Sequence, residues 1–504
     1  MVYASIKVYQ IPFKMKKIFI ISVLSIVFLV TSCEKTKTYG VDATVNDEIN
    51  YFIWKGLNTY YLWQKEVPDL ADNRFANFTD LYFYFRGYSS PEDVFESLRH
   101  QPGTVDRFSW IVDDYVALEN SFNGINLSNG MEFGLVQYTN GSDNVFGYVR
   151  YVIANSDADA KDVSRGMIFN SINGSQLTLT NYRNLLFNND FSYTVGFADF
   201  NDGAPIANSN DISLTKEELQ ENPVALTKVF TEGANKIGYL MYNQFARNYD
   251  GQLNAAFSNF ISEGINELII DLRYNGGGSV SSATYLGSMV TGQFNGDLYS
   301  QEVWNDKVRN AIPAERFLNN FTDEIKNTDA NGNVVLQESI NSLGLDNVYF
   351  ITTYSTASAS ELVINSLSSH IDVKLVGKTT RGKQVGSITL YDSDNLQKNG
   401  SNLNPDHKYA MQPLVLEISN KDNINYPNGI IPGTTFPGIE LGEDYNNLGA
   451  LGERTDPLLD RTLIYITTGA KTSNKTGEFY NFNEIFNSKL ATPAKEYMFI
   501  DMKK

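Results

Sequence analysis

Two side chains that are 25 positions apart, Ser358 and Lys383, could act together as a nucleophile and its base. Ser358 lies in a run of small and hydroxyl-bearing residues between a predicted buried strand and a predicted helix, where a sharp turn can expose a hydroxyl. The N–H of Ala359 would then point at the same space and could stabilise an oxyanion. Serine needs a base, and a lysine can serve where burial disfavours its ammonium form.

Each of these residues also has a simpler explanation when it is considered alone. Ser358 and Glu361 have the S-x-x-E spacing of a helix capping box, which favours a structural role for the serine. A single lysine in a loop is usually a solvated charge. His370 follows Ser358 by 12 residues, which is about 18 Å along a helix and too far for a base. The other two histidines lie in the first predicted domain and in a polar loop, so Lys383 is the best candidate base.

A glycine-rich turn is a third possible component of the site. The apolar run Asn266–Arg273 predicts a buried strand, and it ends in Tyr274–Ser279 (YNGGGS) before a helix of small and apolar residues. Glycine backbones and helix N-termini offer free N–H groups that can bind an anion. The spacing does not fit a Walker A loop or a dinucleotide fingerprint. The turn is therefore either an oxyanion hole or a purely structural tight turn.

The elements around these segments predict an α/β domain over residues 216–472. Helical patterns occur at 252–264 and after Ser358, and apolar runs indicate strands at Ile237–Tyr242, Val348–Thr353 and Val373–Val376. A polar linker, about 202–222, precedes the first of these strands. The aromatic, Asn-rich segment 292–346 is less regular and is interpreted as an insertion or a cap. No structure is predicted for the C-terminal tail, 473–504.

Residues 121–215 predict a small β domain, with period-two strands at Met131–Tyr138 and Phe146–Val152. The order of its segments resembles a PDZ domain, with Phe133, Gly134, Leu135 and Val136 in the position of the carboxylate-binding loop. That resemblance implies that a peptide adds as a strand and that backbone N–H groups hold its terminal carboxylate. The alternative is a generic small β domain.

The N-terminal part of the chain predicts an export signal and a small helical domain. The basic patch Lys14–Lys17 and the 13 apolar residues Ile18–Val30 fit a signal peptide over 1–32, since a membrane-spanning helix needs about 20 residues. Val30–Cys33 resembles a bacterial lipobox, in which Cys33 would be acylated. The alternative is an ordinary cleaved signal in which this cysteine is incidental. A polar tether, 33–46, and a mainly helical, aromatic-rich domain, 47–120, follow.

Composition and charge exclude several other classes of function. The formal charge of −18 and the lack of a large Lys/Arg cluster argue against a nucleic-acid binder. A single cysteine excludes an internal disulfide and multi-cysteine metal sites, and three histidines leave little for a metal site. No metal or cofactor is predicted. Acylated Cys33 would place an acidic body on the lipid bilayer of the cell envelope, with the outer membrane favoured and the periplasmic or surface face left open.

Three ordered motifs together resemble the carboxyl-terminal processing (tail-specific) serine proteases. Asp271–Gly278 resembles the D-L-R-x-N-x-G-G motif of that family, Ser355–Glu361 its S-A-S-A-S-E segment, and Val376–Lys383 its V-G-x-x-T-x-G-K segment. The separation of serine and lysine matches that of the family, and Asn425–Pro432 resembles its Gly-Ile-x-Pro segment. The PDZ-like region also lies where that family has its PDZ domain, so the resemblance covers about residues 47–470.

The resemblance implies both a fold and a site. The fold is an α/β protease core with a mixed sheet, crotonase-like or ClpP-like, together with a PDZ-like β domain and a small N-terminal helical domain. Ser358 would be the nucleophile and Lys383 the general base, with an oxyanion hole formed by Ala359 and by Gly276 or Gly277. Many members of the family carry a lysine-orienting glutamine four residues after the lysine. This chain has Ser387 there.

The leading hypothesis is a lipid-anchored serine endopeptidase with a Ser–Lys dyad, which acts on proteins or peptides whose C-termini the PDZ-like domain presents. The substitution at Ser387 motivates a second hypothesis, a catalytically weak member of the family that binds peptides or another ligand. The many aromatic residues and the anchor suggest a third, a glycan- or polymer-binding surface lipoprotein.

Overall fold

A six-stranded mixed sheet forms the centre of the predicted α/β region. The computed structural model describes residues 43–188, 190–329, 331–471, 482 and 484–500. The spatial order of the strands is β10 (Val224–Glu232), β11 (Asn235–Tyr242), β12 (Glu267–Asp271), β18 (Asn347–Thr352), β19 (Asp372–Gly377) and β24 (Gly438–Glu440). The β10–β11 pair is antiparallel and every other pair is parallel. The apolar runs of β12 and β18 fit strands that are covered on both faces.

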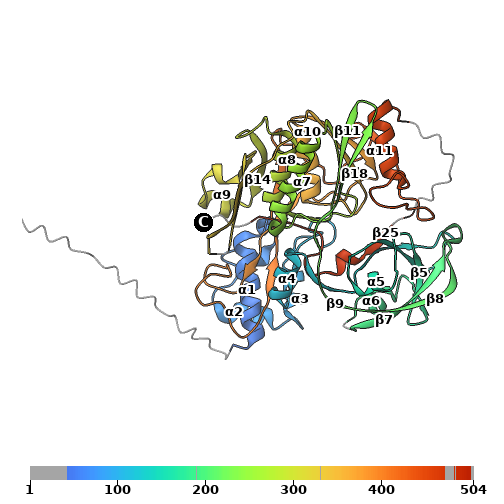
Figure 1. Cartoon of the computed structure of the whole chain (residues 1–504). Helices are drawn as coiled ribbons and strands as arrows, with labels where there is room; N and C mark the ends of the chain where they lie inside the picture. Colours follow the sequence, from blue (N-terminus) through green and yellow to red (C-terminus); the bar gives the residue numbers. More distant parts are fainter. Residues whose placement is uncertain (1–42, 189, 330, 472–481, 483, 501–504) are drawn as a thin grey trace, which may run out of the picture. The chain divides into compact units, whose positions relative to one another are not determined.

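Helices cover both faces of this sheet (Figure 1). Helices α7 (Asp250–Glu263), α8 (Val280–Thr291) and α10 (Ala359–Ser368) lie on one side, and α11 (Pro457–Thr468) lies on the other. Leucines of α11 pack against the strands in one buried cluster with Ile237, Tyr239 and Ile269. The glycine turn follows β12 and the Ser358 segment follows β18. Because β12 and β18 are parallel neighbours, both segments emerge at the same edge of the sheet.

A second six-stranded sheet lies beside this edge. Its spatial order is β13 (Gly277–Ser279), β26 (Tyr497–Phe499), β20 (Val385–Ser387), β23 (Leu414–Asn420), β14 (Leu298–Trp304) and β15 (Leu318–Asn320). The prediction of an irregular insertion at 292–346 is therefore wrong. β14 is an inner strand of this sheet, and β16 (Glu324–Thr328) and β17 (Val334–Ser339) form a hairpin. Most aromatic residues of the segment, among them Tyr299 and Phe321, are buried.

The region that resembles a PDZ domain is a seven-stranded sheet with two short helices. Its strands are β3 (Met131–Gln137), β4 (Val145–Val152), β5 (Ile168–Ile172), β6 (Ser175–Gln176), β7 (Ser192–Asp199), β8 (Ile206–Thr215) and, from the tail, β25 (Glu484–Asn487). The helices are α5 (Asp157–Ala160) and α6 (Tyr182–Leu186). The polar linker predicted at 202–222 is wrong, because β8 pairs with β7 and β9 (Glu217–Gln220) pairs with β2 (Ile125–Ser128). β8 is an exposed edge strand, and its polar sequence is consistent with that position.

Four helices dominate the N-terminal region: α1 (Val45–Tyr60), α2 (Phe78–Phe85), α3 (Pro91–Ser97) and α4 (Tyr115–Phe122), with 3-10 turns η1 (Gln64–Glu66) and η2 (Pro68–Leu70). β1 (Trp110–Val112) joins β22 (Ala410–Gln412) and β21 (Leu390–Tyr391). The amide of Asn305 also donates to the carbonyls of Thr59 and Tyr61 at 3.0 Å. Residues Thr44–Lys504 therefore form one compact unit.

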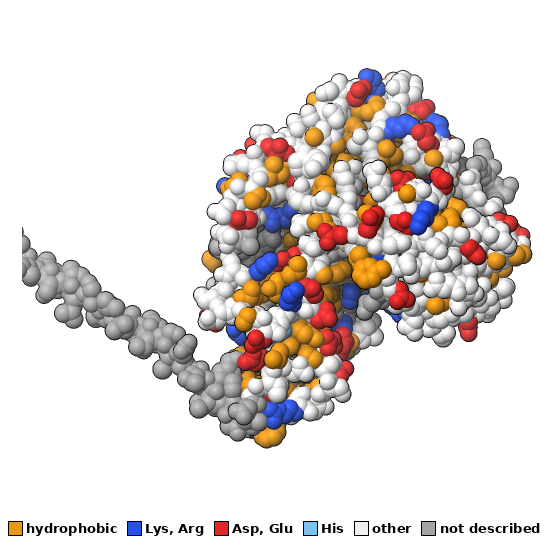
Figure 2. Space-filling model, turned by 60° about the horizontal axis from the view of Figure 1, so that its bottom comes forward, with side chains coloured by type: hydrophobic (Ala, Val, Ile, Leu, Met, Phe, Trp, Pro, Cys, Tyr) orange, Lys and Arg blue, Asp and Glu red, His pale blue; other side chains and the backbone are white. Residues whose placement is uncertain are grey.

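The first unit, Met1–Ala43, contains the predicted signal peptide and Cys33, which lie outside the described residues. Within the part of the chain that the structure describes, no helix has the length and apolar character needed to cross a membrane. On the face of the molecule seen in Figure 2, acidic and basic side chains are interspersed rather than separated by sign.

Candidate active site

Ser358 sits at a strained position between β18 and α10. Its backbone has φ +67° and ψ −116°, which is rare for a residue with a side chain and costs about 1–3 kcal/mol. The residue is fully buried. Its Oγ makes no hydrogen bond to any described residue. Ser358 and Glu361 form the predicted capping box at the start of α10, in which Glu361 accepts the Ser358 backbone N–H, while the Ser358 hydroxyl itself has no hydrogen-bond partner among the described residues.

The carboxylate of Glu361 joins the nucleophile segment to the lysine segment. Oε2 accepts the N–H of Ser358 and the N–H of Lys383, each at 2.8 Å. Oε1 accepts the Gly382 N–H at 2.7 Å and the Thr380 hydroxyl at 2.5 Å. Burial raises the pKa of Glu361, and the four donors oppose that shift. The S-x-x-E spacing thus positions two backbone segments at once, a role that the sequence interpretation missed.

Lys383 is enclosed by protein and is 1% exposed. Burial lowers the pKa of its amine from 10.5 to about 7, although the carboxylates of Glu496 and Glu361 oppose this shift. The rings of Phe108 and Trp110 lie 4.9 and 5.7 Å from Nζ. A lysine with this pKa is substantially neutral near neutral pH and can accept a proton.

Ser358 and Lys383 line the same small cavity, of about 20 Å³, together with Glu361 and Met498. A cavity of this size holds about one water molecule. Lys383 Nζ donates to the backbone carbonyl of Glu496 at 2.6 Å, and no hydrogen bond joins it to Ser358 Oγ in the described structure. Catalytic hydrogen bonds are often long or absent before substrate binds. The two candidate residues therefore line one cavity without a hydrogen bond between them.

Two backbone N–H groups beside the serine are available to an oxyanion. Those of Ala359 and Gly276 have no acceptor among the described residues. The N–H of Gly277, also predicted as a donor, instead donates to Asn275 Oδ1 at 2.9 Å. Asn275 fixes the turn further, because its carbonyl accepts the Ser360 hydroxyl at 3.0 Å and its side-chain amide donates to the Tyr242 carbonyl at 2.8 Å. Ala359 and Gly276 are thus the better-placed pair.

Gly277→Ala is expected to lower kcat about 10- to 100-fold, because a Cβ at this position would lie 2.7 Å from Ser358 Cβ and displace it. Its φ of +111° also disfavours a side chain, so a stability loss of about 1–3 kcal/mol should accompany the change. The matched control is Gly174→Ala, at φ +75° with no atom within 4 Å of the added Cβ. Steady-state kinetics and thermal unfolding of both variants test this. Equal activity of the two variants would contradict the assigned position of Gly277.

Ser387 does not contact Lys383 Nζ in the described structure. Its Oγ lies 2.6 Å from Gln412 Oε1 and 3.1 Å from the carbonyl of Met498. Gln412 comes from β22 and is fully buried. A glutamine is therefore present beside the position that would hold the family's lysine-orienting residue, but it comes from another strand. A comparison with the family at the position four residues after the lysine could not identify Gln412, which is distant in the sequence.

Residues Phe133–Val136 lie inside strand β3, which confirms the strand predicted at Met131–Tyr138, and not in the carboxylate-binding loop that the PDZ resemblance implies. Their side chains are buried, and a Cβ on Gly134 would meet the ring of Tyr148 at 2.5 Å. The outer partner of β3 is β25 of the C-terminal tail. These four residues therefore lie at a sheet edge that the tail strand β25 already pairs with.

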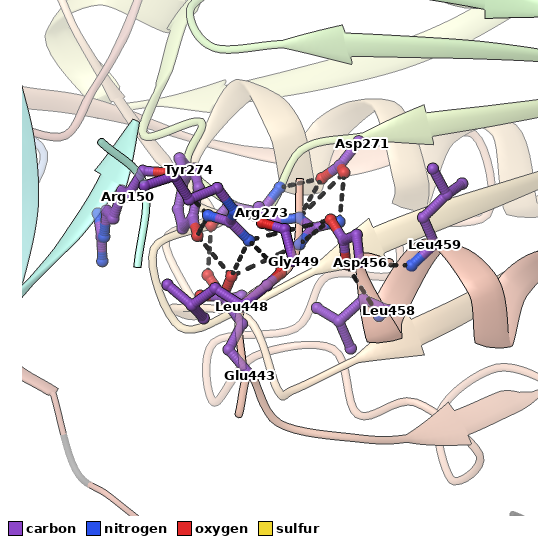
Figure 3. A network of polar contacts seen from close by, with 12 residues as sticks. Arg150, Asp271, Arg273, Tyr274, Glu443, Leu448, Gly449, Asp456, Leu458 and Leu459 are labelled. Carbon is purple, nitrogen blue, oxygen red and sulfur yellow. Dashed lines mark hydrogen bonds and ion pairs between the residues drawn. The ribbon is translucent and has the colours of Figure 1, made fainter. Parts of the chain in front are cut away.

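A buried ion network joins the PDZ-like sheet to the glycine turn (Figure 3). Arg273, the arginine of the D-L-R motif, pairs with Asp271 at 2.7 Å and with Asp456 at 2.8 Å. From the PDZ-like side, Arg165 donates to the hydroxyl of Tyr274 at 2.7 Å, and Arg150 reaches Ser355 Oγ at 2.8 Å. The glycine turn, through Tyr274, and the serine segment, through Ser355, are thus fixed to the neighbouring sheet by charged hydrogen bonds.

A cavity of about 580 Å³ opens beside the site. It is bounded by β2 and β3 on one side, by Gly276 and Gly277 on another, and by tail residues from Asn487 to Tyr497. The cavity lies between the β3 edge and the glycine turn, and Ser355 is the residue of the serine segment that lines it.

Comparisons with known proteins agree with this arrangement. Residues 236–403 match the model of peptidase family S41, and residues 48–110 match the model of the peptidase S41 N-terminal domain. A probable CtpA-like serine protease of Staphylococcus aureus (strain MRSA252) is 23% identical over 296 residues, which are 55% of this chain and 53% of that protein. One from Staphylococcus haemolyticus (strain JCSC1435) is 22% identical over 250 residues, 45% of this chain and 46% of that protein. The chain spans about half the length of the curated relatives it matches.

A solved structure shares the fold. The crystal structure of a protein provisionally named an S41 protease, from Bacteroides fragilis NCTC 9343, aligns with a TM-score of 0.60 and 22% identity. The alignment covers 83% of this chain and 97% of that one.

Proposed function

We propose that this chain, a serine peptidase of family S41 by its matched regions, is an endopeptidase that works with a Ser358–Lys383 dyad. The observation that carries the proposal is a strained, buried serine with a free hydroxyl, in one small cavity with a buried lysine of pKa about 7. Neutral Lys383 takes the proton of the Ser358 hydroxyl as Oγ attacks the carbonyl carbon of the substrate.

The oxyanion that forms is held by the N–H groups of Ala359 and Gly276, to which the N-terminus of α10 adds a favourable dipole. The protonated lysine then gives its proton to the departing amine, and the acyl group remains on Ser358. A water molecule, deprotonated by the same lysine, hydrolyses this ester and restores the enzyme. Gly277 can join the oxyanion hole only if Asn275 Oδ1 releases its N–H.

The PDZ-like sheet serves as the docking surface for the substrate C-terminus. Support comes from the edge of β3, which already binds a strand, β25, by backbone pairing and which borders the cavity lined by Gly276 and Gly277. The substrates are proteins or peptides, and acylation of Cys33 would tether the enzyme to the outer membrane. Cell fractionation and metabolic lipid labelling of the Cys33→Ala variant test the anchor.

Labelling by a fluorophosphonate probe tests the nucleophile. The folded protein should react at Ser358, identified by peptide mapping, because the free Oγ and the neutral lysine make this hydroxyl reactive. The Ser358→Ala variant should not be labelled. Ser368→Ala, at the far end of α10 where the hydroxyl bonds only the Asn365 carbonyl, should be labelled at the wild-type rate. Absence of labelling in folded wild type would favour a peptide-binding protein with little activity.

A further inference from the structure

The C-terminal tail passes through the candidate active site as an extended strand. β26 lies between β13, which begins at Gly277, and β20, which follows Lys383. Its register with β13 is parallel, with Gly277 opposite Tyr497 and Ser279 opposite Phe499. Ser387 of β20 lies opposite Phe499. The tail therefore fills the space between the two segments that carry the oxyanion turn and the base.

The tail backbone contacts the catalytic groups directly. The carbonyl of Glu496 accepts from Lys383 Nζ at 2.6 Å, and the carbonyl of Met498 lies 3.1 Å from Ser387 Oγ. A Cβ on Gly277 would lie 2.4 Å from the Tyr497 carbonyl, so the turn and the tail are in close backbone contact. A peptide substrate cannot occupy this space while the tail is there.

The other end of the tail occupies the sheet edge proposed to hold substrate C-termini. β25 pairs antiparallel with β3, with Glu484 opposite Val136 and Phe486 opposite Leu135. The Phe133 N–H donates to Ser488 Oγ at 3.0 Å. One segment, 484–500, thus covers both the β3 edge and the catalytic groove.

Side chains of the tail make specific contacts with the residues that surround it. The ring of Tyr497 stacks on Phe122 with centroids 4.8 Å apart, and its hydroxyl accepts from Gln244 at 2.7 Å. Phe499 stacks on the same Phe122 ring at 5.1 Å. The carboxylate of Glu496 pairs with Arg381 at 3.1 Å. These contacts with three separate segments distinguish residues 484–500 from a chain end that merely crosses the surface.

The tail is placed so that it resists cleavage. The carbonyl of Glu496 accepts from Lys383 Nζ. The N–H groups of Ala359 and Gly276 have no acceptor among the described residues. A carbonyl outside the oxyanion hole gains no stabilisation as it becomes tetrahedral, so the bound strand is an inhibitor and not a substrate. The contact also holds the lysine amine against Glu496 and away from a hydrogen bond with Ser358.

We propose that residues 484–500 are an intramolecular inhibitor, which binds the β3 edge and the β13–β20 groove in place of a substrate polypeptide. An incoming polypeptide C-terminus competes first for the β3 edge, and the loss of β25 pairing then frees β26 from the groove. This inference rests on the proposed function, since it assigns the tail to the groove of the Ser358–Lys383 enzyme.

The full chain carrying Tyr497→Ala and Phe499→Ala tests the proposal, because both rings that anchor the tail to Phe122 are removed. We expect it to be labelled by fluorophosphonate, and to cleave peptides, at least tenfold faster than wild type. A synthetic peptide of residues 484–500 should slow it again, and a scrambled peptide should not. Tyr465→Ala is the matched control, a buried tyrosine on α11 that packs in a different cluster.

A second measurement needs no variant. After wild type has been labelled at Ser358, hydrogen exchange of the amides in 497–499 should become fast, while β18 stays protected, because the adduct and the tail need the same space. A folded double variant that is labelled no faster than wild type, or a tail that stays protected in labelled wild type, overturns the inference and leaves the proposed function standing. Absence of Ser358 labelling in both wild type and the folded double variant overturns both.

Discussion

Replacing Lys383 by methionine is expected to lower kcat by about 10⁴-fold, the usual cost of removing one member of a nucleophile–base unit. Methionine keeps the length and the apolar contacts of the side chain with Phe108 and Trp110 but cannot accept a proton. KM should change little, because Nζ contacts the tail in the resting protein and acts on the serine in the reaction. Steady-state kinetics of the wild-type and variant full chains measure this loss.

The same lysine predicts how activity depends on pH. The pKa of Lys383 is about 7, so the neutral base is lost below that pH. Activity should therefore fall about tenfold per unit as pH drops below 7 and should level off above it. A profile of kcat/KM between pH 5 and 9 gives the pKa of this base in the free enzyme.

Burial of Lys383 also makes the free energy of unfolding depend on pH. Burial depresses its pKa from 10.5 to about 7, so between these values the unfolded chain binds more protons than the folded one. The free energy of unfolding should rise with pH across that window, and the cost of burying the amine should be fully present below pH 7. Lys383→Met should therefore raise the melting temperature most at pH 6, while it abolishes activity.

Lys378→Met is the matched control, since this lysine lies in the same loop but is exposed and pairs with Glu440 at 3.1 Å. It should change neither the pH profile nor the melting temperature by more than a small amount. If Lys383→Met kept more than a tenth of the wild-type kcat, the lysine would not be the base.

The glycine turn and the Ser358 segment were predictable because each is marked by a local sequence pattern. A buried apolar run followed by Asn-Gly-Gly-Gly, and another followed by small residues before a helix, indicate strand–turn–helix units from sequence alone. The parallel pairing of β12 and β18 then brings both turns to one edge. The matches to peptidase family S41 support the predicted enzyme class, and the shared fold confirms the mixed-sheet core.

The features that the sequence did not reveal depend on contacts between distant segments. Polarity could not separate an exposed edge strand such as β8 from a linker, because both face water. Gln412 lies 25 residues from Ser387 and meets it only through strand pairing. The short apolar run Tyr497–Ile500 could have signalled a strand, but nothing local indicates that its partners are β13 and β20.

Glu361→Gln is expected to have the second largest effect, a fall in kcat of about 10²- to 10³-fold, because a displacement of about 1 Å at the nucleophile can cost 10²-fold. The carboxylate accepts four hydrogen bonds, and an amide must turn an NH₂ group toward some of these donors. Stability should fall by about 2–4 kcal/mol, since buried N–H groups would lose their acceptor.

Kinetics at a temperature where the Glu361→Gln variant is fully folded separate the loss of positioning from the loss of stability. Glu440→Gln, at an exposed carboxylate beside the same loop, is the control and should keep wild-type kcat. A single carboxylate oxygen, Glu361 Oε2, accepts the backbone N–H groups of both Ser358 and Lys383. Loss of that shared acceptor should therefore lower kcat and the rate of fluorophosphonate labelling together, while KM stays near its wild-type value. A folded variant that is labelled at the wild-type rate would show that the dyad keeps its geometry without Glu361.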